Sequence, residues 1–487
     1  MKFTENPPKI YNILISLSEW FNVFYFQKIQ IYLSMVCVIT DFFTACDGSN
    51  RSNDTPLIIT LNGDSSITLF FNEAYKELGA SVINDKDGSI DVVISGSVNS
   101  SSLGSYTITY SATDSAGNKS STTRTVYVIL PAKAKNVILF IGDGMGQEHI
   151  KAARWLKVGA DGQLSMDDMP VKGKLKTHSA NKVTTDSAAA ATAMATGFKT
   201  NNGVISLDAN LNYVSTILED AKSYDKAVGL VTTTHITHAT PAAFAAHVES
   251  RKSMLDIAQQ MITAGIDILF GGGEDEFIPI SDNGCFPKAG ERVDGRDLIY
   301  EAVSDGYKFV CDSTSFDLIT SSSNKRVLGL FSDQGMSRPY SPTLASMTLK
   351  AIDILSKNSE GFFLMVEGGQ IDWASHSNDA ENAIADTIAL DDAVEIAKQF
   401  ASFKRNTLII VTADHETGGM VVTTSSSGLE NEDGPYNING GGLFYINWST
   451  TGHTSVNVPV AAMGPQSEKL IGVNENTFIH DIIFNTF

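Results

Sequence analysis

The chain has 487 residues, of which 43% are hydrophobic and 18% are charged, so it is long enough to form two or three domains with a large core. Its formal net charge of −20 argues against a nucleic-acid partner, because phosphate backbones attract basic surfaces. The negative charge does not exclude a small phosphorylated substrate, since a bound cation reverses the local charge. The sequence has four cysteines and no CxxC spacing, so any metal must be held by oxygen and imidazole ligands.

The N-terminal segment, residues 1–46, has two interpretations. Its apolar run at residues 29–40 is followed by Thr-Ala-Cys, which resembles a bacterial export signal ending in a lipoprotein box. Cys46 would then be lipidated and tether the protein to a membrane, at the periplasmic side or the cell surface. The alternative is a disordered N-terminus, because a charged residue interrupts the apolar pattern. In the first interpretation Cys285 and Cys311 remain as a pair that can form a disulfide in an oxidising compartment.

A Ser/Asn/Asp-rich linker at residues 47–55 leads into a stretch of short alternating runs at residues 56–130. Runs of period two, separated by Gly, Asn and Asp, predict a small antiparallel β-sandwich. The segments ELGASVIND and SLGSYTITYSATDSAGN resemble the bacterial Ig-like repeats of secreted enzymes. Nothing in this module has a catalytic pattern, so we expect a spacer or a binding accessory.

Residues 134–487 alternate between buried-strand patterns and helical patterns. Strands are predicted at residues 136–141, 227–232, 267–270, 327–331, 362–366 and 408–412. Helices are predicted at residues 188–197, 213–223, 251–264, 342–356 and 379–402. This alternation predicts an α/β fold in which a mostly parallel central sheet is flanked by helices on both faces.

Polar side chains directly follow several of these strands, at the edge where parallel sheets bind ligands. They are Asp143, His238, Thr240, Glu367, Asp414 and His415. Acids that converge at one edge would repel one another strongly, so their convergence implies bound cations. The GDGMG segment around Asp143 leaves two alternatives, a plain tight turn and a dinucleotide-binding loop, although it lacks the GxGxxG spacing.

Asp372 and His376 are four residues apart, which places both on one face of a helical turn and suits a shared Zn²⁺. A surface contact is the plain alternative for such a pair. His453 precedes a predicted strand at residues 459–463 and would count as structural if it stood alone. Two Asp–His sets and a further histidine in one chain favour a metal centre.

The segment VTTDSAAAATAMATG places Ser187 at the start of an Ala-rich helix, directly after Asp186. Such a pair is usually an ordinary N-cap. The unpaired N–H groups of a helix N-terminus also attract anions, which suits a reactive hydroxyl. The acids and histidines elsewhere in the chain favour the second interpretation.

Six segments resemble the motifs of bacterial alkaline phosphatases and occur in the order found in that family. They are NVILFIGDGMG, TDSAAAATAMATG, ITHATPAAFAAHVESR, FFLMVEGGQIDWASH, VTADHETGG and GHTSVNVPV. The resemblance implies metal-dependent hydrolysis of a broad range of phosphomonoesters, with release of inorganic phosphate. It further implies a phosphoseryl intermediate, two zinc ions, a third metal (Mg²⁺) and a dimer. The segment at about residues 271–342 matches the motifs least, so we expect an insertion that caps the site or lies at a subunit contact.

The same resemblance implies a role for each candidate residue. Ser187 is expected to be the nucleophile and Arg251 to clamp the phosphate. One zinc is expected on Asp372, His376 and His453, and the second on Asp143, Asp414 and His415. The Mg²⁺ site is expected from Asp143, Thr240 and Glu367, with His238 in it or beside it. Asp186 is expected to fix the loop and orient Arg251.

Two positions depart from some members of the family. His238 stands where they have Asp, and a histidine there could bind the third metal directly. The sequence therefore does not decide whether the third metal is Mg²⁺ or Zn²⁺. Trp373 stands where they have Lys, so a cation is missing near the phosphate and we expect weaker phosphate retention.

Two other functions compete with phosphomonoester hydrolysis. One is a phosphodiesterase or sulfatase of the same superfamily, which Ser187, Arg251 and the third metal site argue against. The other is a surface adhesin with an inert enzyme domain, which the full set of candidate ligands makes a poor explanation.

Overall fold

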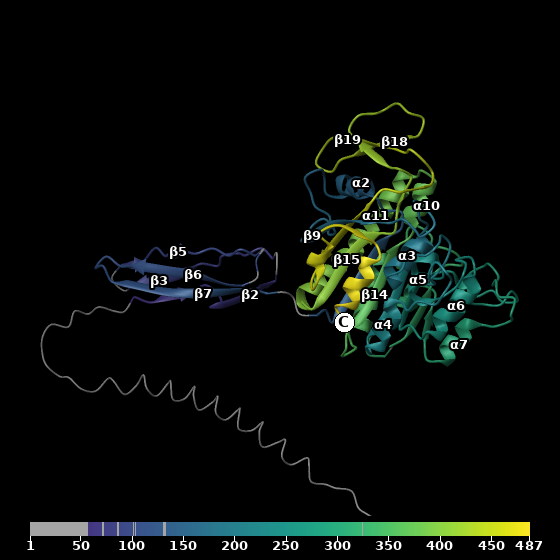
Figure 1. Ribbon diagram of the computed structural model, residues 1–487, viewed down its shortest axis with the longest axis horizontal. Helices are drawn as coiled ribbons and strands as arrows, with labels where there is room; N and C mark the ends of the chain where they lie inside the picture. The colour runs from purple at the N-terminus through teal and green to yellow at the C-terminus, as the bar shows by residue number, and fades with distance from the viewer. Residues whose placement is uncertain are drawn as a thin grey trace, which may run out of the picture. The chain divides into compact units, whose positions relative to one another are not determined.

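The computed structural model describes residues 57–70, 73–84, 87–100, 102, 104–129, 133–323 and 325–487. Figure 1 draws an N-terminal β part and a larger α/β part. The interpretations of residues 1–46 and 47–55, including a tether through Cys46, fall outside the described residues and stay predictions. In the described part of the chain, no helix combines the length and apolar character needed to cross a membrane.

The N-terminal β part contains two small sheets. One consists of β1 (Ile59–Leu61), β3 (Ala80–Asn84) and β4 (Gly88–Ser89). The other has the order β2-β7-β6-β5, with β2 (Ser66–Phe70), β7 (Lys119–Ile129), β6 (Gly104–Thr113) and β5 (Val93–Ser95). β2 pairs with β7 in parallel, so the prediction of a purely antiparallel module was wrong for this pair. A parallel pair joins strands that are distant in the sequence, and alternation alone cannot show its direction.

The α/β part is built on a ten-stranded sheet (Figure 1). In spatial order its strands are β12 (Lys308–Val310), β13 (Val327–Leu330), β11 (Ile268–Gly272), β10 (Ala227–His235), β14 (Phe362–Gly368), β8 (Asn136–Gly142), β15 (Thr407–Ala413), β21 (Val458–Met463), β9 (Val171–Lys176) and β22 (Gly472–Glu475). β21 runs antiparallel to β15 and β9, and the other pairs are parallel. The central strands are fully buried, as expected for a parallel sheet covered on both faces.

Helices surround this sheet. They are α2 (Gln147–Lys157), α3 (Ser187–Thr196), α4 (Ile217–Ser223), α5 (Ala239–Ala245), α6 (Met254–Thr263), α7 (Leu298–Ser304), α8 (Ser313–Asp317), α9 (Leu344–Leu355), α10 (Gln370–His376), α11 (Ala380–Phe403) and α12 (Phe478–Phe484), with short 3₁₀ helices η1 (Glu274–Glu276) and η2 (Ser467–Leu470). The helix predicted at residues 213–223 begins only at Ile217, because Thr216 and Glu219 form a capping box there.

Both faces of the sheet are covered, as the sequence predicted. Phe362 and Phe363 are neighbours on β14, so their side chains point to opposite faces. Phe362 packs against Phe400 of α11, with ring centroids 5.7 Å apart. Phe363 packs against Phe244 of α5, with centroids 5.9 Å apart. The predicted α/β fold with two helical layers is therefore confirmed.

The carboxyl ends of the central strands meet at one edge of the sheet. Gly142 of β8 pairs with Gly368 of β14 on one side and with Ala413 of β15 on the other. The register therefore brings the residues that follow β8 and β15, Asp143 and Asp414, to the same edge. Two small sheets lie beyond the main one: β16 (Glu416–Thr417) with β20 (His453–Thr454), and β17 (Val421–Thr423), β19 (Leu443–Asn447) and β18 (Glu432–Asn437).

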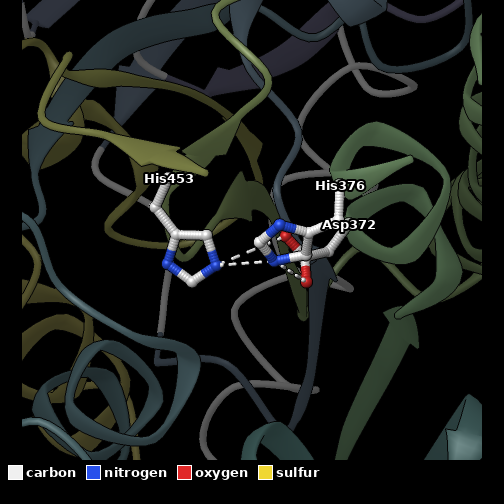
Figure 2. A group of neighbouring side chains, drawn as sticks. All are labelled: Asp372, His376 and His453. Carbon is white, nitrogen blue, oxygen red and sulfur yellow. Dashed lines mark hydrogen bonds and ion pairs between the residues drawn. The ribbon is translucent and has the colours of Figure 1, made fainter. Parts of the chain in front are cut away.

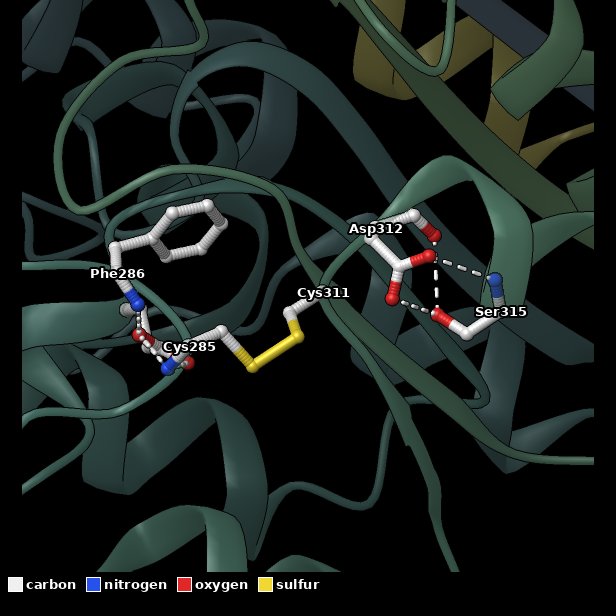
Figure 3. Close-up of a disulfide and its surroundings, with 6 residues drawn as sticks. Cys285, Phe286, Cys311, Asp312 and Ser315 are labelled. Atoms are coloured by element: carbon white, nitrogen blue, oxygen red, sulfur yellow. Dashed lines mark hydrogen bonds between the residues drawn. A yellow bond between two sulfur atoms is a disulfide. The ribbon is translucent and has the colours of Figure 1, made fainter.

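The segment at about residues 271–342 adds β12 and β13 to the far edge of the sheet. Figure 3 shows its disulfide, which joins Cys285 to Cys311 directly after β12. The backbone N–H of Cys285 also donates to the Glu274 carboxylate at 2.8 and 2.9 Å. The pairing left open by the sequence is therefore present, and disulfides of this kind persist in oxidising compartments.

Candidate active site

Ser187 is the first residue of α3, and Asp186 caps that helix. Asp186 Oδ1 accepts from the backbone N–H of Ala189 at 3.0 Å, and Oδ2 accepts from that of Gly203 at 3.0 Å. The N-cap role expected from the sequence is therefore present. All residues of α3 are buried, and its alanines allow close packing against α5. The Ser187 hydroxyl is thus fixed among helix N–H groups that favour negative charge.

Arg251 links the Ser187 loop to the start of α5. Its Nη1 donates to Asp186 Oδ2 at 3.2 Å, so the predicted contact between these residues is present. Its Nη2 lies 3.0 Å from His238 Nε2. A guanidinium only donates, so His238 Nε2 must accept and the neutral ring carries its proton on Nδ1. Burial, reinforced by the Arg251 charge, lowers the pKa of His238 to about 3.

Asp372, His376 and His453 form the first group of candidate metal ligands (Figure 2). Asp372 and His376 lie on α10, and His453 reaches them from β20. His376 Nε2 is 3.3 Å from Asp372 Oδ2 and 3.1 Å from His453 Nε2. One ligand atom from each residue lies within 4.8 Å of the other two.

The outer nitrogens of both histidines face backbone carbonyls. His376 Nδ1 is 2.5 Å from the carbonyl of Thr451, and His453 Nδ1 is 2.9 Å from that of Thr185. Carbonyls only accept, so both Nδ1 atoms carry protons and each neutral ring presents a bare Nε2. The bare Nε2 atoms of the two histidines face each other and the Asp372 carboxylate. These electron-rich groups repel one another unless a proton or a cation lies among them. This donor set fits Zn²⁺.

Asp143, Asp414 and His415 form the second group, and all three are fully buried. His415 Nε2 is 3.2 Å from Asp414 Oδ2 and 3.5 Å from Asp143 Oδ1. The Ser187 hydroxyl joins this group, with Oγ 3.3 Å from His415 Nε2. Within the described residues, neither oxygen of Asp143 has a hydrogen-bond partner. Burial raises the pKa of Asp143 well above its ordinary value, and the neighbouring Asp414, Asp372 and Glu367 raise it further.

Asp143 also belongs to the third group, with Glu367 and His238. Glu367 Oε2 accepts from Thr232 and Thr234, whereas Oε1 has no partner in the described part of the chain. The Thr240 hydroxyl, also buried, has none among the same residues. Burial raises the pKa of Glu367 to about 7. These oxygen atoms fit a hard cation such as Mg²⁺.

Trp373 stands beside these groups without belonging to any of them. Its ring makes edge contacts with His235 and His238, with centroids 6.0 and 5.9 Å apart. A Cβ added to Gly335 would lie 2.5 Å from the Trp373 ring, so glycine permits this packing. The structure therefore places every residue expected at the site around one edge of the sheet.

Comparison with known proteins identifies the family that carries such a site. The alkaline phosphatase family model matches residues 134–435. The chain belongs to the alkaline phosphatase family. It is thus a phosphoric monoester hydrolase. A second model, the Ig-like domain of bacterial surface proteins, matches residues 59–128.

Individual relatives extend the match. Alkaline phosphatase 4 of Bacillus subtilis is 41% identical over 308 residues, which cover 60% of this chain and 63% of that protein. Alkaline phosphatase of Escherichia coli is 35% identical over 405 residues, which cover 71% of this chain and 84% of that one. The solved alkaline phosphatase of the Antarctic bacterium TAB5 is 34% identical, with a TM-score of 0.63, over 74% of this chain and 98% of that chain.

Sequence patterns did not reveal several polar groups that support the site. The buried His235 Nδ1 lies 2.7 Å from Glu276 Oε1, and the His235 ring contacts Trp373. The Thr417 hydroxyl contacts Asp372 and His415. The His235–Glu276 and Thr417–Asp372 contacts join residues 41 and 45 positions apart, so the local sequence pattern does not indicate them.

His149 of α2 is a further buried group that the sequence did not mark. Its Nδ1 accepts from the backbone N–H of Gly146 at 3.2 Å, and its Nε2 lies 2.9 Å from Ser375 Oγ. Burial lowers the pKa of His149 from 6.5 to about 4. The unfolded state therefore binds more protons between these values, so stability is lost as the pH falls from 6.5 toward 4.

We expect His149→Gln to weaken this pH dependence in the metal-free protein. Between pH 8 and pH 5 the free energy of unfolding should fall by about 2 kcal/mol less in the variant than in the wild type. Urea unfolding at the two pH values measures this difference. Equal pH dependence in His149→Gln and wild type would contradict the assignment.

Proposed function

We propose that the enzyme hydrolyses phosphomonoesters through a phosphoseryl intermediate on Ser187, with two zinc ions and one Mg²⁺. The observation that supports this proposal most strongly is the position of the Ser187 hydroxyl. It lies at a helix N-terminus, 3.3 Å from His415 Nε2, on a loop that Asp186 fixes beside Arg251. A serine hydroxyl is a weak nucleophile at neutral pH, and cations held by the adjacent ligand groups would favour its alkoxide.

Three groups of residues would hold the metals. Asp372, His376 and His453 would hold one zinc, Asp143, Asp414 and His415 the other, and Asp143, Thr240 and Glu367 the Mg²⁺. When bound, these ions supply positive charge at the attacking and leaving oxygens of an in-line displacement. The unpartnered oxygens of Asp143, Thr240 and Glu367 support this assignment.

The protein residues would act on the phosphoryl group in two steps. Ser187 Oγ attacks phosphorus, the bond to the leaving alcohol breaks, and the alcohol departs after gaining a proton. Water then attacks the phosphoserine, which releases inorganic phosphate and restores the serine. Arg251 has two roles in this proposal, because Asp186 holds one end of its guanidinium while the remaining donors bind phosphoryl oxygens.

His238 would lie beside the third metal rather than bind it. With Arg251 donating to Nε2, the proton lies on Nδ1, a buried atom that has no hydrogen-bond partner among the described residues. Direct ligation would require Nδ1 to lose that proton and Arg251 to give up the contact. A TAB5 alkaline phosphatase in which a histidine is replaced by aspartate binds Mg in its M3 site. This supports Mg²⁺ as an ion for sites of this kind.

Trp373→Lys is expected to lower the inhibition constant for inorganic phosphate. The indole borders His238 and carries no charge, whereas a lysine ammonium there would attract the phosphate dianion. Inhibition of phosphomonoester hydrolysis by added phosphate measures the constant. Trp373→Met serves as the control for loss of the ring without gain of charge. An unchanged or raised constant in Trp373→Lys would contradict the proposed role of this position.

We further propose export of the enzyme to the periplasm or cell surface. The Ig-like domain of bacterial surface proteins and the Cys285–Cys311 disulfide both support an oxidising, extracytoplasmic location. Tethering through Cys46 and assembly into a homodimer are proposed on the resemblance alone.

The proposed activity is tested by comparing three chromogenic esters. Turnover of a phosphomonoester should exceed that of a phosphodiester and a sulfate ester by several orders of magnitude. A preference for the diester or the sulfate would favour the other hydrolases of the superfamily. Absence of turnover with all three esters, in protein loaded with Zn²⁺ and Mg²⁺, would favour the alternative of a surface adhesin with an inert enzyme domain.

A further inference from the structure

Thr417 is a fully buried residue of β16 whose hydroxyl lies between two ligand groups. Its Oγ1 is 2.5 Å from Asp372 Oδ1, in the first group. The same atom is 3.2 Å from His415 Nδ1, in the second group. One hydroxyl therefore contacts a candidate ligand of each proposed zinc ion.

The single proton of this hydroxyl decides which nitrogen of His415 is protonated. An ionised carboxylate only accepts, so Thr417 must donate its proton to Asp372. Its oxygen can then only accept from His415, which places the His415 proton on Nδ1. The neutral ring is left with a bare Nε2, the atom that faces Asp143, Asp414 and Ser187. The opposite tautomer would point an N–H at the acids and block a cation.

The backbone holds Thr417 in this position from two sides. Its N–H donates to the carbonyl of Gly144 at 3.1 Å, directly after Asp143. Its partner in the antiparallel pair of β16 with β20 is His453. Gly144 has a φ of +75°, and a Cβ there would lie 2.9 Å from both Thr417 Oγ1 and Asp372 Cα. The loop after β8 therefore approaches the hydroxyl closely, and the side chain has little freedom to turn away.

The group that fixes the tautomer of His415 differs from those that fix the tautomers of the other two histidines. His376 and His453 donate to backbone carbonyls, which fix their tautomers whatever the neighbouring side chains do. The acceptor for His415 is a hydroxyl, and it accepts only while Asp372 takes its proton. The tautomer of a second-site ligand thus depends on the carboxylate of a first-site ligand.

We propose that Thr417 is a positioning residue that couples the two zinc sites by fixing the His415 tautomer through Asp372. The proposal rests on the proposed function, because it takes both groups to be zinc ligands. It adds that the contact of one hydroxyl with both ligand groups prepares the second site for its ion. Removing the hydroxyl should therefore weaken zinc binding at a site whose own ligands are all intact.

Thr417→Val tests this directly, since valine keeps the shape and removes the hydroxyl. Competition with a chromophoric chelator should show zinc binding weakened by roughly 10- to 100-fold, the range typical for lost partners of metal ligands. Thr417→Ser should restore wild-type affinity. Thr348→Val is the matched control, because Thr348 is equally buried but donates within α9, to Leu344 at 2.8 Å. Wild-type affinity in a folded Thr417→Val would overturn the proposal.

The His415 tautomer provides a second readout that needs no variant. Nitrogen NMR of the metal-free wild-type protein should show His415 protonated at Nδ1. A ring protonated at Nε2 alone would overturn the proposal even if Thr417→Val failed to fold. Neither readout uses turnover, so their outcome is separate from that of the proposed function. If the wild-type enzyme is active and Thr417→Val binds zinc with unaltered affinity, the proposed coupling is contradicted. The proposed phosphatase mechanism is not contradicted by that result.

Discussion

Ser187→Ala is expected to lower kcat/KM for a phosphomonoester by roughly 10³-fold or more, the scale seen when a covalent nucleophile is removed. The remaining groups can still bind phosphate, since Arg251 and the metal ligands are untouched. Steady-state hydrolysis of a chromogenic phosphomonoester measures the loss. KM should change far less than kcat, because the hydroxyl acts mainly in the reaction step.

The chain offers a matched control for this substitution. Ser313 is the first residue of α8 and follows the N-cap Asp312, whose side chain accepts from Ser315. It reproduces the Asp–Ser arrangement of α3 but lies on another helix, without the acids and histidines. Ser313→Ala should retain wild-type turnover. Turnover of Ser187→Ala close to that of the wild type would refute covalent catalysis at this residue.

Removal of metals is expected to abolish turnover, and Zn²⁺ with Mg²⁺ should restore it. Burial raises the pKa of Asp143 and of Glu367, and neighbouring carboxylates raise both further, so without cations these two acids bind protons more readily. Metal analysis of the reconstituted protein should find two zinc ions and one magnesium per chain. Binding must release those protons, so metal affinity should fall as the pH falls.

His453→Ala isolates one zinc site in the same experiment. It removes a ligand of the first group and leaves the second and third groups intact. The reconstituted variant should hold one zinc and one magnesium and turn over poorly. His480→Ala, which changes a histidine outside all three groups, should keep the full metal content. Full activity after exhaustive chelation, with no metal detected, would contradict the mechanism.

The main outline of the fold was predictable because its strands are unusually apolar. Strands buried on both faces read as continuous hydrophobic runs, and the run before Asp143 and the run before Asp414 are examples. The small module was less predictable, since the parallel pairing of β2 with β7 leaves no local pattern. Residues 213–216 fit the helical pattern but precede α4, because the capping box of Thr216 and Glu219 starts the helix at Ile217.

Most candidate ligands could be found from the sequence because they follow a strand or share a helical turn, whereas the role of His453 depended on the family resemblance. Their supporting contacts could not. Thr417 and Asp372 are 45 residues apart, and the packing of α10 against β16 brings them together. The contact of Arg251 with His238 likewise depends on how α5 begins, and it favours one of the two expected positions of His238, beside the third metal.

The central claim is that Ser187 carries the phosphoryl group during turnover. Quenching the enzyme in acid during hydrolysis of a phosphomonoester, followed by digestion and mass spectrometry, tests it most directly. The account predicts phosphoserine at Ser187, in the peptide that also contains Asp186, and none in protein quenched without substrate. Turnover that continues with no phosphorylated peptide, or with phosphate on another residue, would contradict it.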